Sequence, residues 1–137
     1  MRGSIDHLDL TVREPSASRA FYEAVLGFMG YTSVRPHDDG LDFDMPAQNG
    51  WRCSIALRRA RGEAATRLHD RYAPGLHHVA FYAADRADVD ALHRLLVGIG
   101  AAVLDAPAEY PQYGPGYYAV FFADPDGLKL EFVCRGR

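Results

Sequence analysis

Hydrophobic and polar residues alternate along residues 5–12, close to the start of the chain. The apolar side holds Leu8, Leu10 and Val12, and the polar side holds His7, Asp9 and Thr11. A period of two is typical of a half-buried β-strand that turns its apolar face to the core. The sequence therefore predicts a first strand whose second face carries side chains able to do chemistry.

A helical period follows this strand, over residues 16–26. An apolar stripe recurs there every three or four positions, Pro15 precedes the first turn, and Gly27 is placed to end the helix. Three strand-like runs come next, separated by turn-rich stretches, at 29–35, 41–45 and 52–59. The first half of the chain is therefore predicted to be a βαβββ module.

The same order of patterns restarts after a polar, basic stretch. A strand is predicted at 76–83, a helix at 86–97, and further strands at 102–105, 117–123 and 128–134. His7 matches His78 and Gly27 matches Gly98, each at an offset of 71 residues (78 − 7 and 98 − 27). We therefore predict an α+β protein of two βαβββ modules, about 1–59 and 76–137, joined by a linker, about 60–75, that carries a short helix.

Length and charge narrow the class of protein. A chain of 137 residues fits one domain in which both modules share a core. The net charge of −3 provides no broad positive field, which argues against a nucleic-acid partner. No apolar run has the length of a signal peptide or a membrane span, so we predict a cytoplasmic protein without a membrane partner. Cys53 and Cys134 match no zinc or redox spacing, and we predict buried reduced thiols.

Three polar side chains are predicted to meet on the inner face of the sheet, the face turned away from the helices. The two strand histidines, His7 and His78, point there, as does Glu131, because its apolar neighbours take the helix side. Two imidazoles and one carboxylate form a facial arrangement suited to Fe²⁺ or Mn²⁺, with positions open for substrate. Zn²⁺ uses the same ligands, but a closed structural zinc site would need a fourth. The structural alternatives are a satisfied strand histidine and a carboxylate paired with Lys129.

Several neighbouring residues are candidates for a role at this site. Strand alternation points His77 to the side opposite His78. Asp9 shares a face with His7, where it can orient a ligand or act as a base; an ion pair with Arg58 is the alternative. In the tyrosine-rich stretch 110–118, Tyr118 is predicted to point inward as a catalytic phenol, and a packed loop is the alternative.

Four segments carry a resemblance to a known superfamily: His7-Leu8-Asp9-Leu10-Thr11-Val12, the helix 18–27, His77-His78-Val79-Ala80-Phe81, and 124–131 from Asp-Pro-Asp-Gly to Glu131. The chain resembles the vicinal oxygen chelate superfamily of glyoxalase I, bleomycin-resistance proteins, fosfomycin thioltransferases and extradiol dioxygenases. The resemblance covers nearly the whole chain. It implies a glyoxalase-like cup, a curved mixed sheet with helices outside, and a homodimer that binds a small-molecule substrate.

The positions that match the metal ligands of this superfamily are His7, Ala56, His78 and Glu131. The slot equivalent to Glu131 in the first module holds alanine, at an offset of 75 residues (131 − 56). The resemblance thus implies a divalent-metal enzyme acting on an oxygen-chelating substrate, dioxygenase-like rather than a glyoxalase-type isomerase. Asp9 stands where fosfomycin enzymes present a threonine, which argues against that substrate. The alternative is a metal-free binding protein that sequesters an aromatic compound or antibiotic.

Overall fold

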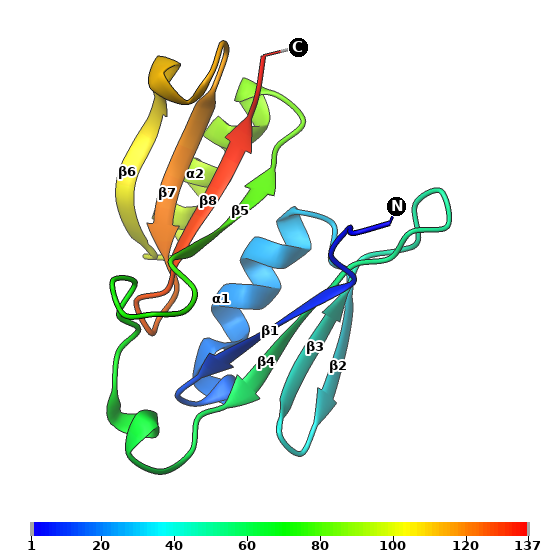
Figure 1. The fold of residues 1–137 in the computed structure, drawn as a ribbon, viewed down its shortest axis with the longest axis vertical. Helices are drawn as coiled ribbons and strands as arrows, with labels where there is room; N and C mark the ends of the chain where they lie inside the picture. The colour runs from blue at the N-terminus through cyan, green and yellow to red at the C-terminus, as the bar shows by residue number, and fades with distance from the viewer. Residues whose placement is uncertain (1, 137) are drawn as a thin grey trace. The chain divides into compact units, whose positions relative to one another are not determined.

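The computed structural model describes residues 2–136, which divide into two compact units, the first ending at Arg67 and the second beginning at Leu68. Each unit contains four strands and one α-helix in βαβββ order (Figure 1). The predicted α+β class and the predicted repeat are therefore confirmed.

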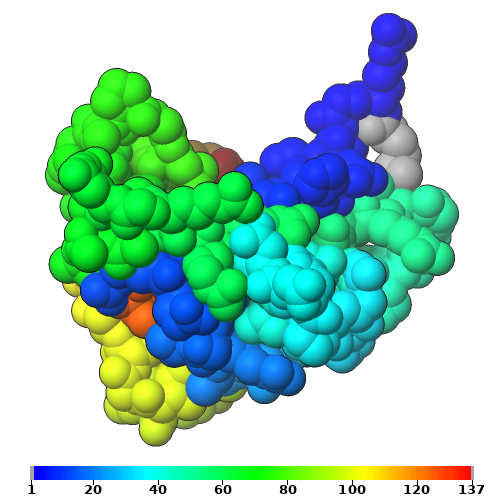
Figure 2. All heavy atoms as spheres, turned by 90° about the horizontal axis from the view of Figure 1, so that it is seen from below, coloured from blue at the N-terminus to red at the C-terminus, as the bar shows by residue number. Residues whose placement is uncertain are grey.

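Unit 1 consists of β1 (His7–Val12), α1 (Pro15–Phe28), β2 (Ser33–His37), β3 (Gly40–Asp44) and β4 (Ser54–Arg59). The strand order is β1-β4-β3-β2, with β1 parallel to β4 and the other neighbours antiparallel. The helix buries Tyr22, Val25 and Leu26 against the sheet, whereas the edge strand β2, cyan in Figure 2, lies at the surface. A short 3₁₀ helix (Gly62–Thr66) follows β4, in the predicted linker.

Unit 2 repeats this plan with β5 (His78–Tyr82), α2 (Arg86–Gly98), β6 (Ala102–Glu109), β7 (Tyr118–Ala123) and β8 (Lys129–Cys134). A 3₁₀ turn (Pro111–Tyr113) connects β6 to β7. The strand order is β5-β8-β7-β6, so β8 lies between β5 and β7 (Figure 1). Val89, Leu92 and Leu96 of α2 are completely buried and cover the outer face of the sheet.

The glycines that end the helices are not the predicted ones. Gly27 lies within α1, and Gly98 is the last residue of α2. The backbone turns left-handed at Gly30 (φ 101°) and Gly100 (φ 70°), and a residue with a Cβ rarely adopts this conformation. The stop signal therefore does recur between the units, but two to three residues later than the sequence predicted.

The inner faces of the two sheets differ in chemistry. In unit 1 the inner face is polar, and it carries Asp9, Asp42 and Arg58 in neighbouring strands. In unit 2 the inner face is largely apolar, with a buried cluster made of Tyr117, Ala119, Phe121 and Val133, against which Tyr110 packs. Unit 2 therefore supplies the apolar surface on which a small organic molecule can bind.

The structure also bears on the predictions about membrane spans and cysteines. No helix formed by residues 2–136 combines the length and hydrophobicity needed to cross a membrane. Both cysteines are free thiols, as predicted, and Cys134 is buried, but Cys53 is only half-buried.

Candidate active site

Glu131 is the buried acid of unit 2. It stands in the middle of β8, where Leu130 and Phe132 pack on the helix side, and only 2% of it is exposed. Its Oε2 lies 3.3 Å from Nε2 of His78, and its Oε1 accepts a hydrogen bond from the Tyr117 hydroxyl. A carboxylate is costly to bury unless its oxygens have partners, and here each oxygen has one.

The second ring nitrogen of His78 is also engaged. Its Nδ1 lies 2.7 Å from Nδ1 of His77. Desolvation, together with the nearby charges of His78 and Lys129, lowers the pKa of His77, which is therefore neutral at pH 7. A neutral His77 can accept the Nδ1 proton of His78, so a metal ion would bind His78 through Nε2, in place of the direct contact between Nε2 and Glu131.

His7 shows the same arrangement in unit 1. Its Nδ1 lies 2.7 Å from Oδ1 of Asp6, whose hydrogen bond and charge raise the pKa of His7. In both units, then, the residue that precedes the strand histidine engages its Nδ1, at the same offset of 71 residues (77 − 6). Hydrogen-bond partners of this kind orient a metal-binding imidazole and leave Nε2 as the atom that binds the metal ion.

The separation of His78 Nε2 and Glu131 Oε2 in unit 2 fits two ligands of one metal ion. Two ligand atoms held at about 2.1 Å from one metal, at right angles, are about 3.0 Å apart. The Nε2–Oε2 separation of 3.3 Å is close to that value. Within neither unit, among the described residues, do three His, Cys, Asp or Glu side chains gather closely enough to hold an ion. The structure thus brings His78 and Glu131 together, and His7 as third ligand stays a prediction.

The predicted inward position of Tyr118 is wrong. Its hydroxyl donates to Oδ1 of Asp90 on α2, at 2.7 Å, so the ring lies on the helix side of the sheet. The inward phenol is that of Tyr117, which bonds Glu131. Desolvation and this hydrogen bond raise the pKa of Tyr117 to about 12, so its hydroxyl remains a proton donor at neutral pH.

The two adjacent tyrosines provide a matched pair of substitutions. We expect Tyr117→Phe to destabilise the metal-free protein by about 1–3 kcal/mol, because it leaves Oε1 of the buried Glu131 without a donor. Tyr118→Phe should cost about 0.5–1.5 kcal/mol, since Asp90 is only partly buried and can be hydrated. Urea denaturation of both variants measures the difference; a larger loss for Tyr118→Phe would contradict this assignment.

A cavity of about 430 Å³ opens beside the His78–Glu131 pair. His77, Tyr113, Tyr117 and Phe121 line it, together with Lys129 and Arg135 at its border. The lining therefore combines aromatic rings with the two candidate ligands, His78 and Glu131, and with two cations.

Asp9 forms the ion pair that was the alternative to a catalytic role. Nε of Arg58 donates to Oδ2 of Asp9 at 3.1 Å, and Nη1 of Arg58 lies 3.2 Å from Nε2 of His37. His37 in turn contacts Asp42 at 3.1 Å. Asp9 is thus one member of a charged network across the inner face of unit 1, in which the buried Ala56 supplies no ligand.

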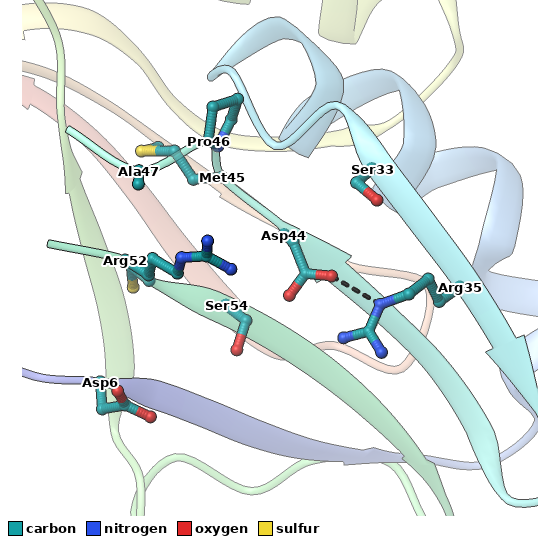
Figure 3. Close-up of a pocket in the computed structure, with 10 residues that line it drawn as sticks. Asp6, Ser33, Arg35, Asp44, Met45, Pro46, Ala47, Arg52 and Ser54 are labelled. Atoms are coloured by element: carbon teal, nitrogen blue, oxygen red, sulfur yellow. Dashed lines mark hydrogen bonds and ion pairs between the residues drawn. The ribbon is translucent and has the colours of Figure 1, made fainter. Parts of the chain in front are cut away.

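A second cavity, of about 550 Å³, lies in unit 1 (Figure 3). Arg35 pairs there with Asp44 at 2.8 Å, and Arg52 points into the space from the segment before β4. Asp6 and Ser54 complete its polar border. Two cations and two carboxylates balance each other in this cavity, and it contains none of the predicted metal ligands.

Comparison with known proteins identifies the family. The model of the Glyoxalase/Bleomycin resistance protein/Dioxygenase superfamily matches residues 4–132, and the chain belongs to this superfamily. The resemblance inferred from the four sequence segments is therefore confirmed.

Individual relatives agree with this assignment. The chain is 30% identical over 128 residues to the uncharacterized protein YqjT of Bacillus subtilis (strain 168), covering 93% of this chain and 96% of that protein. A crystal structure from Bacillus halodurans has a TM-score of 0.78 at 28% identity, over 96% of both chains. The glyoxylase/bleomycin resistance protein/dioxygenase domain from Frankia sp. EAN1pec has a TM-score of 0.71 at 26% identity, over 98% of both chains.

Proposed function

We propose that this protein is a divalent-metal-dependent enzyme that acts on a small substrate with two adjacent oxygen atoms. The observation that carries the proposal is the contact between His78 Nε2 and the buried Glu131 Oε2 in the lining of a cavity rich in aromatic side chains. Members of this superfamily commonly bind divalent metals, and we propose His7, at the equivalent position of unit 1, as the third ligand. Fe²⁺ and Mn²⁺ suit this ligand set best, with Zn²⁺ as the alternative.

The residues around the pair have separable roles in this proposal. A bound ion would act as a Lewis acid toward the two substrate oxygens. Tyr117 fixes one oxygen of Glu131 and so leaves the other for ligation, and His77 fixes the tautomer of His78. The aromatic wall excludes water from one side of the substrate and limits its orientation.

Ala56 favours a dioxygenase-like reaction over an isomerisation. Its methyl group is buried in β4 and offers neither a metal ligand nor a base. Asp9, the register neighbour of Ala56, is held by Arg58, which lowers its availability for proton abstraction. The dioxygen chemistry that a bound Fe²⁺ or Mn²⁺ would supply needs no carboxylate at this place.

Metal content tests the proposal directly. Protein purified without a metal-affinity column should contain about one divalent ion per site, and dialysis against a chelator should lower its melting temperature. His78→Ala should lose this ion, whereas His93→Ala, on the partly exposed surface of α2, should retain it. Elemental analysis and thermal denaturation measure both effects. Wild-type protein that binds none of Fe²⁺, Mn²⁺ or Zn²⁺ would overturn the proposal.

A second candidate function is metal-free binding of an aromatic compound. The aromatic wall formed by Tyr113, Tyr117 and Phe121 supports it, because such surfaces bind planar molecules without a metal. Calorimetry with a catechol separates the two candidates. An affinity that a chelator leaves unchanged favours sequestration, and an affinity that is lost when a chelator removes the metal favours the enzyme. The single-domain organisation, the homodimer and the cytoplasmic location remain predictions that accompany either candidate.

A further inference from the structure

Two cations at the cavity of unit 2 have no carboxylate partner among the described residues. Nζ of Lys129 lies 4.6 Å from the centroid of the Phe121 ring, and Cζ of Arg135 lies 4.7 Å from that of Tyr117. Glu131 is the one carboxylate of the cavity lining, and it is already in contact with His78 and Tyr117. The cavity therefore carries an excess of positive charge, which a divalent ion would increase further.

The positions of both cations are set by the backbone. Lys129 lies opposite His78 in the parallel β5–β8 pair, two residues before Glu131. Arg135 is followed by Gly136, whose N–H donates to the Pro115 carbonyl at 3.1 Å. A Cβ on Gly116 would come within 2.5 Å of Gly136, so this crossing of two segments requires glycine and places Arg135 over Tyr117.

Contacts between neighbouring rings hold the aromatic side chains of this cavity in place. Tyr110 and Tyr113 stack at 5.8 Å with an interplanar angle of 19°, and Tyr113 meets Tyr117 at 5.4 Å. Tyr110 and Phe121 form an edge-to-face pair, with their ring centroids 5.3 Å apart. Tyr113 nevertheless remains 57% exposed, so a ring surface supported by its neighbours stays open to a ligand.

We infer that this cavity binds a planar aromatic compound that carries a carboxylate, with its ring on the tyrosine wall and its charge matched by Arg135 and Lys129. A guanidinium such as that of Arg135 presents a fork of donors that fits a carboxylate. Lys129 is partly buried beside Phe121, and partial desolvation strengthens the attraction of its charge for an anion. The inference rests on the proposed function, whose substrate class it narrows to aromatic acids.

Benzoate and benzamide test the inference, because they match in shape and differ in charge. Each compound is titrated into the 137-residue chain in the presence of a chelator, and binding is followed by NMR. Benzoate should bind at least tenfold more tightly than benzamide. Arg135→Gln and Lys129→Gln should each weaken benzoate binding by about tenfold and leave benzamide binding unchanged. Arg94→Gln, an exposed position on α2, removes the same charge as a control and should leave both ligands unaffected.

The outcomes that would overturn the inference are distinct. Benzoate that binds no more tightly than benzamide, including no detectable binding of either, would overturn it, as would equal losses in Arg94→Gln and Arg135→Gln. Circular dichroism of each variant establishes that it is folded. These titrations contain no metal, so they test only whether the cavity binds an aromatic acid. The metal content of the wild type separately tests the proposed enzyme function.

Discussion

Glu131→Gln is expected to weaken metal binding by at least 100-fold, about 2.7 kcal/mol, while the metal-free protein remains folded. Glutamine has the size of glutamate and offers an amide oxygen to the Tyr117 hydroxyl, but it lacks the negative charge that a divalent ion requires. Because a charge is costly to bury even when its oxygens have partners, and Glu131 is 2% exposed, the neutral side chain should leave the metal-free protein at least as stable as the wild type.

Thermal denaturation with added Fe²⁺, Mn²⁺ or Zn²⁺ measures this effect. The wild type should gain melting temperature as the metal concentration rises, and Glu131→Gln should not. Glu63→Gln is the matched control, since it removes the same charge from a side chain that is 92% exposed, and it should behave as the wild type does. An unchanged metal-dependent shift in Glu131→Gln would show that Glu131 is not a ligand.

The inward position of Glu131 could be predicted because its neighbours differ from it in polarity. Leu130 and Phe132 had to face the helix, and the pleat then left one direction for the carboxylate. The histidine of β5 was found for a related reason, because the repeat marked His7 and His78 as equivalent. Where a strand has one apolar and one polar face, sequence alternation is enough to assign a side.

Tyr117 was missed because β7 provides no such contrast. Residues 119–123 are buried on both faces of the sheet, so hydrophobicity does not distinguish the helix side from the inner side. The assignment follows only from the pairing of Phe121 with Glu131 across β7 and β8. Register between strands depends on contacts distant in sequence, and a single strand does not encode it.

His77 was assigned to the wrong side because it lies outside the strand. It precedes β5, where the backbone no longer follows the pleat, and it lines the same cavity as His78. The sequence also did not indicate a role for Lys129 and Arg135. Their role as anion-binding cations depends on their contacts with Phe121 and Tyr117, which are distant in sequence or set by the fold. The Asp9–Arg58 pair, in contrast, was named as an alternative, since both residues take polar inner positions in their predicted strands.

Gly40→Ala is expected to destabilise the protein by about 3 kcal/mol. Gly40 begins β3 and faces Arg58 of β4, and a Cβ there would lie 1.7 Å from the Leu57 carbonyl oxygen. That oxygen belongs to the backbone of a central strand, so relief requires β3 and β4 to separate. Because Arg58 holds Asp9 and contacts His37, the same separation should disrupt the charged network of unit 1.

Gly27→Ala in α1 provides the control for this prediction. A Cβ at Gly27 meets nothing within 4 Å, and its backbone is helical, so alanine should stabilise the protein by about 0.5–1 kcal/mol. Urea denaturation of both variants should therefore shift the midpoint in opposite directions. A Gly40→Ala variant as stable as the wild type would mean that β3 and β4 do not pair in the register Gly40–Arg58. The polar inner face of unit 1, with Asp42 beside Ala56, would then have to be built differently.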